Sequence, residues 1–190
     1  MKNLTILTII LAILIVLSGC AVTHYGRGVN YLQQQKYSDA IASFKTVLDE
    51  NPKYQAAHTQ LGIAYYQTEM YEQAISEFKT AINLQNSDKK ARLFSGLAYL
   101  KDGRMDDATT EWSTYLDMFP YDNVSEQLKK SLDILKSGGP LPETVVLITD
   151  VIEEKISQEE RIPEMEYYNN FMHYPYSHPF YPYHGYYPCD

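Results

Sequence analysis

Residues 55–88 read QAAHTQLGIAYYQTEMYEQAISEFKTAINLQNSD, and this stretch has a near copy on each side of it in the chain. The copies are 34 residues apart, and a period of about 20–50 residues is typical of repeat architectures. Five features recur at this spacing: a glycine, a tyrosine, an alanine, a large aromatic residue and a residue that ends a helix. They are Gly28, Gly62 and Gly96; Tyr31, Tyr65 and Tyr99; Ala40, Ala74 and Ala108; Phe44, Phe78 and Trp112; and Pro52, Asn86 and Pro120. The sequence therefore predicts three equivalent units.

Each unit is predicted to be a pair of helices, because its apolar residues recur at steps of three and four. In the second unit these are Leu61, Ala64, Tyr65, Ala74, Ile75, Phe78, Ala81 and Ile82. Glycine inside a helix costs about 1 kcal/mol relative to alanine, so three glycines at one phase predict a close approach. We expect the glycine of the first helix to meet the alanine of the second. The aromatic residue four positions after that alanine is expected to fill the gap toward the next unit.

This pattern resembles the tetratricopeptide repeat family over roughly residues 21–120. The resemblance implies an all-α solenoid of three helix-turn-helix repeats, at residues 21–54, 55–88 and 89–122. After them, an apolar stripe predicts an amphipathic helix that caps the array and ends at Lys136. Its apolar residues are Val124, Leu128, Leu132 and Leu135.

The chain is then interrupted by Ser137-Gly138-Gly139-Pro140, which is a typical helix-breaking run. Residues 143–158 follow, with one stripe made of Val145, Ile148, Ile152 and Ile156. We favour an amphipathic helix here, although the run from Val145 to Ile148 would also suit a strand. The hinge and this segment occupy residues 137–164.

Residues 1–19 form a predicted targeting segment, in which Lys2 precedes an apolar run from Leu4 to Leu17. That run is shorter than the about 20 apolar residues that span a bilayer. The sequence LSGC that ends at Cys20 resembles the bacterial lipobox, which implies removal of residues 1–19 and lipidation of Cys20 by fatty acyl chains. The alternative is a weak membrane anchor that merely ends in a cysteine. By the same resemblance, Ala21 after the cysteine implies the outer membrane, with the protein facing the periplasm.

The chain is acidic, with a formal net charge of -8, and removal of residues 1–19 takes away only the positive charge of Lys2. Phosphate backbones repel such a chain, and no Lys/Arg cluster compensates, so nucleic acid is an unsuitable partner. The composition, 45% hydrophobic and 21% charged, fits one ordinary globular domain with additions.

Residues 165–190 are predicted to be a disordered, low-complexity tail rich in Tyr, Pro and His. Prolines at 175, 179, 182 and 188 prevent regular structure. Its histidines, His173, His178 and His184, are spaced too loosely to define a metal site. We therefore predict no metal.

The sequence contains no zinc-protease helix motif, no nucleophile elbow, no phosphate-binding glycine loop and no paired cysteines, so we predict no enzyme, no catalytic residue and no cofactor. His24 and His58 share one repeat phase, four residues before Gly28 and Gly62. That phase faces neighbouring helices, so a structural role is favoured over a catalytic one.

In the resembled family, the first helix of each repeat lines a concave groove. The matching positions here are Tyr25, Val29, Leu32, Thr59, Ile63, Tyr66, Leu93, Leu97 and Leu100. We predict an apolar and aromatic surface that binds a partner. The alternative is that these side chains are mostly buried between the packed helices. The carboxyl-terminus clamp of some family members is not implied, because Lys90 and Lys101 lie only at the edge of this surface.

The sequence thus predicts a membrane-anchored scaffold for protein–protein interaction in cell-envelope assembly, which binds an apolar peptide or helix of an envelope protein. The alternative is a surface or cell-wall binding protein that works through the Tyr-rich tail. We also expect residues 143–158 to fold back over part of the groove as a displaceable occupant.

Overall fold

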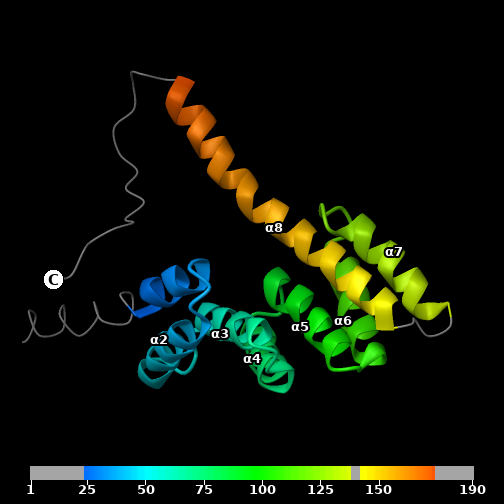
Figure 1. Cartoon of the computed structure of the whole chain (residues 1–190), viewed down its shortest axis with the longest axis horizontal. Helices are drawn as coiled ribbons and strands as arrows, with labels where there is room; N and C mark the ends of the chain where they lie inside the picture. Colours follow the sequence, from blue (N-terminus) through cyan, green and yellow to red (C-terminus); the bar gives the residue numbers. More distant parts are fainter. Residues whose placement is uncertain (1–23, 138–141, 174–190) are drawn as a thin grey trace, which may run out of the picture.

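The computed structural model describes residues 24–137 and 142–173, with side chains described as far as Gln158 (Figure 1). Within these residues every regular element is a helix. After a first helix over residues 24–33, the chain forms α2 (Tyr37–Glu50), α3 (Gln55–Gln67), α4 (Tyr71–Leu84), α5 (Lys89–Lys101), α6 (Met105–Met118), α7 (Ser125–Lys136) and α8 (Pro142–His173). The predicted all-α class is confirmed.

The helices pair and stack as the 34-residue period predicts. α3 packs on α4 and α5 packs on α6, while α2 contacts α3 and α4 contacts α5 across the boundaries between repeats. The second helices begin at Tyr37, Tyr71 and Met105, which are equivalent positions of the three units. α7 packs against α6, where the capping helix was expected, and its stripe of Leu128, Leu132 and Leu135 is buried.

The repeated glycines do mark a close approach, and the side chain nearest to each is the repeat's aromatic residue rather than the expected alanine. A Cβ atom added at each glycine would lie 2.0 to 2.6 Å from an aromatic ring of the same repeat. The pairs are Gly28 with Phe44, Gly62 with Phe78, and Gly96 with Trp112. The aromatic residue therefore fills the space over its own repeat's glycine, because its long side chain reaches back across the helix pair where a short alanine does not.

The turns inside the repeats share one backbone conformation. Gly103 has φ +79°, as the glycine in its turn predicts, and the equivalent positions Gln35 and Glu69 have φ values of 58° and 60°. Glycine adopts this left-handed region freely, whereas in other residues the Cβ atom lies too close to a backbone carbonyl oxygen there. The first two repeats therefore hold a strained residue where the third has a glycine.

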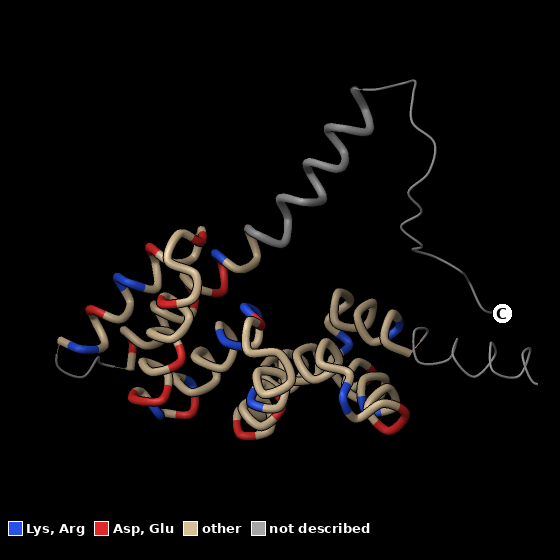
Figure 2. Tube along the Cα trace, turned by 180° about the vertical axis from the view of Figure 1, so that it is seen from behind, with Lys and Arg blue, Asp and Glu red and all other residues tan. Residues whose placement is uncertain are grey.

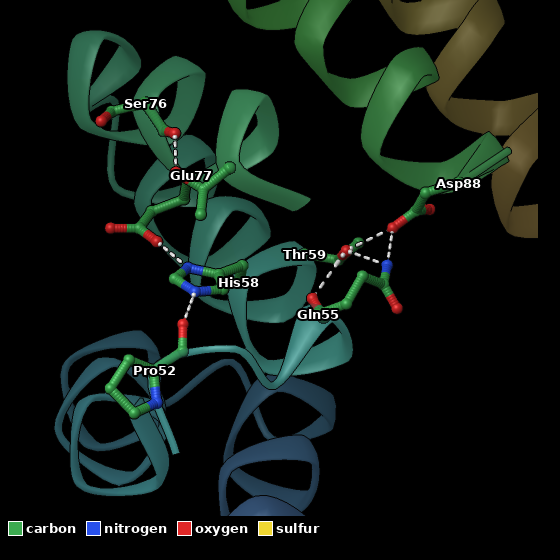
Figure 3. A network of polar contacts seen from close by, with 8 residues as sticks. Pro52, Gln55, His58, Thr59, Ser76, Glu77 and Asp88 are labelled. Atoms are coloured by element: carbon green, nitrogen blue, oxygen red, sulfur yellow. Dashed lines mark hydrogen bonds and ion pairs between the residues drawn. The ribbon is translucent and has the colours of Figure 1, made fainter. Parts of the chain in front are cut away.

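A polar contact joins the two helices of the second repeat and the turn before them (Figure 3). His58 Nδ1 lies 2.7 Å from a Glu77 carboxylate oxygen, and its Nε2 lies 2.9 Å from the carbonyl oxygen of Pro52. Both ring nitrogens thus contact structural groups. This confirms the structural role predicted for His58.

The third repeat has the same contact with different residues. Arg92, at the position equivalent to His58, donates from its guanidinium to Glu111 at 3.0 Å and to the carbonyl oxygen of Asn86 at 3.1 Å. Its side chain is 7% exposed. We call the His58–Glu77 and Arg92–Glu111 contacts the repeat staples.

A second network links the second repeat to the third (Figure 3). The Thr59 hydroxyl donates to the Asp88 carboxylate at 2.6 Å, and the Gln55 amide donates to the same carboxylate. Asp88 also caps α5, since it accepts a hydrogen bond of 3.0 Å from the backbone N–H of Ala91. One buried carboxylate therefore starts a helix and holds the preceding repeat beside it.

The segment after the hinge is a helix and not a strand, and it is longer than expected. α8 begins at Pro142 and ends at His173, so it passes the predicted end at Gln158 and enters the first part of the predicted tail at 165. Residues 164–174 contain neither proline nor glycine, so nothing in that stretch stops the helix before Pro175.

Several predictions concern residues outside the described part of the chain. They are the targeting segment with Cys20, the hinge residues 138–141, and the remainder of the tail with His178 and His184. Among the described residues, no helix has the length and apolar character needed to span a membrane, and no cluster of three His, Cys, Asp or Glu side chains could hold a metal ion.

Candidate partner-binding groove

The first helices of the three repeats and α8 together form the candidate site. α8 begins beside the last helices, contacts α5 and α7, and runs obliquely away from the repeats (Figure 1). The two chain segments that meet here are far apart in sequence. Figure 2 shows the same arrangement from behind, with positive and negative residues spread along the repeats as well as along the described part of α8.

The apolar stripe of α8 is buried. Ile148, Ile152 and Ile156 are 3%, 0% and 6% exposed, and Val145 packs beside them at the edge of the same apolar cluster. Three isoleucines at four-residue steps form one face of a helix. The expectation that this segment folds back onto the repeats is therefore confirmed.

α8 contacts α5, the helix that carries the groove positions of the third repeat. Leu93, Leu97 and Leu100 are at most 4% exposed and lie in the same apolar cluster as the α8 isoleucines. This end of the groove is consequently covered in part by the protein's own helix.

Tyr66 connects the second repeat to α8. Its hydroxyl donates a hydrogen bond to the Glu153 carboxylate, and its ring lies 5.8 Å from that of Tyr71 and 5.6 Å from that of Phe94. Burial raises the pKa of the Tyr66 hydroxyl strongly, and the adjacent Glu153 carboxylate raises it further. Tyr66 is thus a neutral donor that holds Glu153 in one position.

A cavity of about 870 Å³ lies between α8 and the first helices of the three repeats. The repeats contribute apolar side chains from Val29, Leu32, Ile63 and Phe94, polar ones from Gln33, Gln35, Tyr37, Gln60 and Gln67, and the ammonium group of Lys90. α8 contributes Asp150, Glu153, Glu154, Ile156 and Ser157. The open part of the groove is therefore lined by apolar side chains of the repeats, which we call its floor, by glutamines, and by three carboxylates of α8, which we call its acidic wall.

The nine predicted groove positions fall into three groups. Val29, Leu32 and Ile63 line the cavity. Tyr66, Leu93, Leu97 and Leu100 are buried at the end that α8 occupies. The remaining two take part in repeat packing: the Tyr25 ring lies 5.8 Å from Phe44 and 5.3 Å from Tyr54, and Thr59 donates to Asp88. Burial raises the pKa of the Tyr25 hydroxyl, as expected for a ring inserted between helices.

Sequence reasoning missed the glutamines, Phe94 and the carboxylates of α8. One signal for the glutamines was present, because Gln33 and Gln67 are 34 residues apart and both line the cavity. The acidic wall had no such signal, since it depends on how α8 is rotated over the repeats.

Comparisons with known proteins agree with this architecture. The tetratricopeptide repeat family matches residues 31–89. No curated protein sequence was found to match the chain, and the comparisons indicate no catalytic family.

Several solved structures are similar in fold. The TPR domain of Arabidopsis OM64 is 16% identical, with a TM-score of 0.58 over 60% of this chain and 95% of that one. The second TPR domain of human RPAP3, in complex with the HSP70 peptide SGPTIEEVD, is 21% identical, with a TM-score of 0.57 over 62% and 98% of the two chains. The translocator chaperone SycD of Yersinia enterocolitica is 15% identical, with a TM-score of 0.55 over 68% and 93%. The described chain thus has the all-helical fold of tetratricopeptide repeat proteins, and the match to that family spans most of its first repeat and all of its second.

Proposed function

We propose that this protein is a lipid-anchored interaction scaffold of the bacterial cell envelope, which binds an apolar peptide or helix of an envelope protein in its concave groove. One observation supports this most directly: the groove already accepts an amphipathic helix, because α8 buries Ile148, Ile152 and Ile156 at its far end. A surface that seats one such helix has the shape and the apolar character to seat another.

The similar structures support a peptide as the partner, since the RPAP3 domain is described in complex with a peptide. That peptide is acidic, and the groove of this chain presents Asp150, Glu153 and Glu154 on one side. We therefore infer the same mode of binding but a partner of different sequence.

Anchoring through Cys20 at the outer membrane, on the periplasmic side, is the second part of the proposal. It is supported by the sequence LSGC at residues 17–20 and by the apolar run before it. Two or more acyl chains anchor a protein stably. In cells fed a labelled fatty acid, the wild type should take up label and a Cys20→Ala variant should remain an unlabelled precursor. Label on the variant would contradict the lipidation of Cys20.

Site-specific crosslinking tests the groove. A photo-crosslinking residue at Leu32, which lines the cavity, should yield a protein adduct in cells. The same residue at Ser76, which is exposed on α4, provides the matched control and should not yield it. The adduct should also survive deletion of residues 174–190. If that deletion abolishes it, the alternative function through the Tyr-rich tail is correct instead.

A further inference from the structure

α8 leaves the groove over the first two repeats open, and it forms one side of the cavity there. α8 contacts α5 and α7 and buries its isoleucine face, while Asp150, Glu153, Glu154 and Ile156 line the cavity. The apolar floor of the cavity is formed by Val29, Leu32, Ile63 and Phe94, and Phe94 belongs to α5, the helix that α8 contacts. The open cavity is an extension of an existing helix-in-groove interface.

We propose that α8 is a wall of the binding site rather than a plug in it, and that the partner segment carries basic side chains toward α8 and apolar side chains toward the first two repeats. This rests on the proposed function, that the groove binds a partner segment, and adds the chemistry of that segment. A cavity of about 870 Å³ accommodates the side chains of a short segment.

Charge decides the chemistry of the partner. The cavity is lined by three carboxylates from α8 and by one ammonium group, that of Lys90. A segment with Lys or Arg side chains gains attraction along this wall, whereas an acidic segment is repelled by it. The wall is also held in place, because Glu153 accepts the hydrogen bond from the Tyr66 hydroxyl. An apolar floor with a fixed acidic wall therefore selects an amphipathic and cationic segment.

The test compares two synthetic, fluorescein-labelled helical peptides with the same leucine positions. One has lysine and the other glutamate at the remaining positions, and binding to the full chain in detergent is followed by fluorescence anisotropy. The double variant Asp150→Asn with Glu154→Gln removes two charges from the cavity wall. The matched control, Asp133→Asn with Glu143→Gln, removes the same charge from exposed positions of α7 and α8 that do not line the cavity.

We expect the lysine peptide to bind more tightly than the glutamate peptide. The cavity variant should weaken its binding roughly 2- to 10-fold, and the control variant should leave it nearly unchanged. Added salt should reduce the difference between the two variants. Equal affinity for both peptides, or equal effects of both double variants, would overturn the cationic partner while leaving groove binding intact.

A second measurement separates a wall from a plug. The substitutions Ile148→Ala and Ile152→Ala weaken the packing of α8 on the rest of the protein, because they remove buried apolar side chains. Circular dichroism checks that helicity is retained. If α8 is a wall, loosening it should weaken binding of the lysine peptide. Tighter binding would show that α8 competes with the partner, and this proposal would be wrong. If neither peptide binds and the Leu32 crosslink is also absent, the proposed function itself fails.

Discussion

Substitution of the buried glycine Gly62 by alanine tests the packing of the repeats most sharply, because two known effects oppose each other. Alanine in a helix is favoured over glycine by about 1 kcal/mol. The new Cβ, however, would lie 2.5 Å from Cε1 and 2.7 Å from Cδ1 of Phe78. Phe78 is fully buried and its ring stacks at 6.1 Å on that of Phe94, so it has little room to move.

Overpacking of this kind costs typically about 1 to 3 kcal/mol, so the net change should be a loss of up to about 2 kcal/mol. For a chain of this size that corresponds to a fall in Tm of roughly 2 to 4 °C per kcal/mol. Gly26 provides the matched control. It lies in the first helix, and a Cβ there would meet nothing within 4 Å. Gly26→Ala should therefore stabilise the protein slightly.

Urea unfolding followed by circular dichroism measures both variants. A Phe78→Leu substitution should partly rescue Gly62→Ala, because the smaller side chain removes the contact and the two changes then couple. The reasoning is refuted if Gly62→Ala stabilises the protein as much as Gly26→Ala does.

Three further substitutions test other features of the repeats, and unfolding experiments of the same kind measure each. Glu69→Gly should stabilise the protein by up to about 1 kcal/mol, because it relieves a positive φ that Gly103 adopts at the equivalent position. Ala74→Leu should destabilise it by about 1 to 3 kcal/mol, since Ala74 is fully buried; an unchanged melting temperature would contradict the helix register. Glu111→Ala should cost about 2 to 4 kcal/mol, because it leaves the buried Arg92 without its carboxylate. A loss below about 0.5 kcal/mol would mean that this ion pair behaves like an exposed one.

The repeats could be predicted because their signal is local and threefold. Helix periodicity, the 34-residue spacing and the turn at Gly103 all follow from backbone preferences that act within a few residues. The contact of Gly62 with Phe78 was harder to predict. It depends on the direction in which a long side chain leaves its helix, and spacing alone does not give that direction.

The candidate site was predictable only in part. The stripe of Ile148, Ile152 and Ile156 indicated that α8 would pack against an apolar surface, and the three side chains are buried. Two other features were not predictable: how much of the groove α8 covers, and that Glu153 faces the cavity. Both depend on the angle and the rotation of α8 over the repeats. Those are set by tertiary packing. The repeat staples, by contrast, had a signal that was overlooked: His58 and Arg92 are 34 residues apart, as are Glu77 and Glu111.

The repeat staples also imply a gradient of local stability along the array. In the first repeat the position of Glu77 and Glu111 is taken by Ser43, whose hydroxyl donates instead to the carbonyl oxygen of Asp39 within its own helix. Because repeat arrays are stabilised by nearest-neighbour terms, we expect the unit that lacks this carboxylate to open first. That unit carries Val29 and Leu32, which line the open end of the groove. Local opening of the fold is thus greatest where a partner segment would enter.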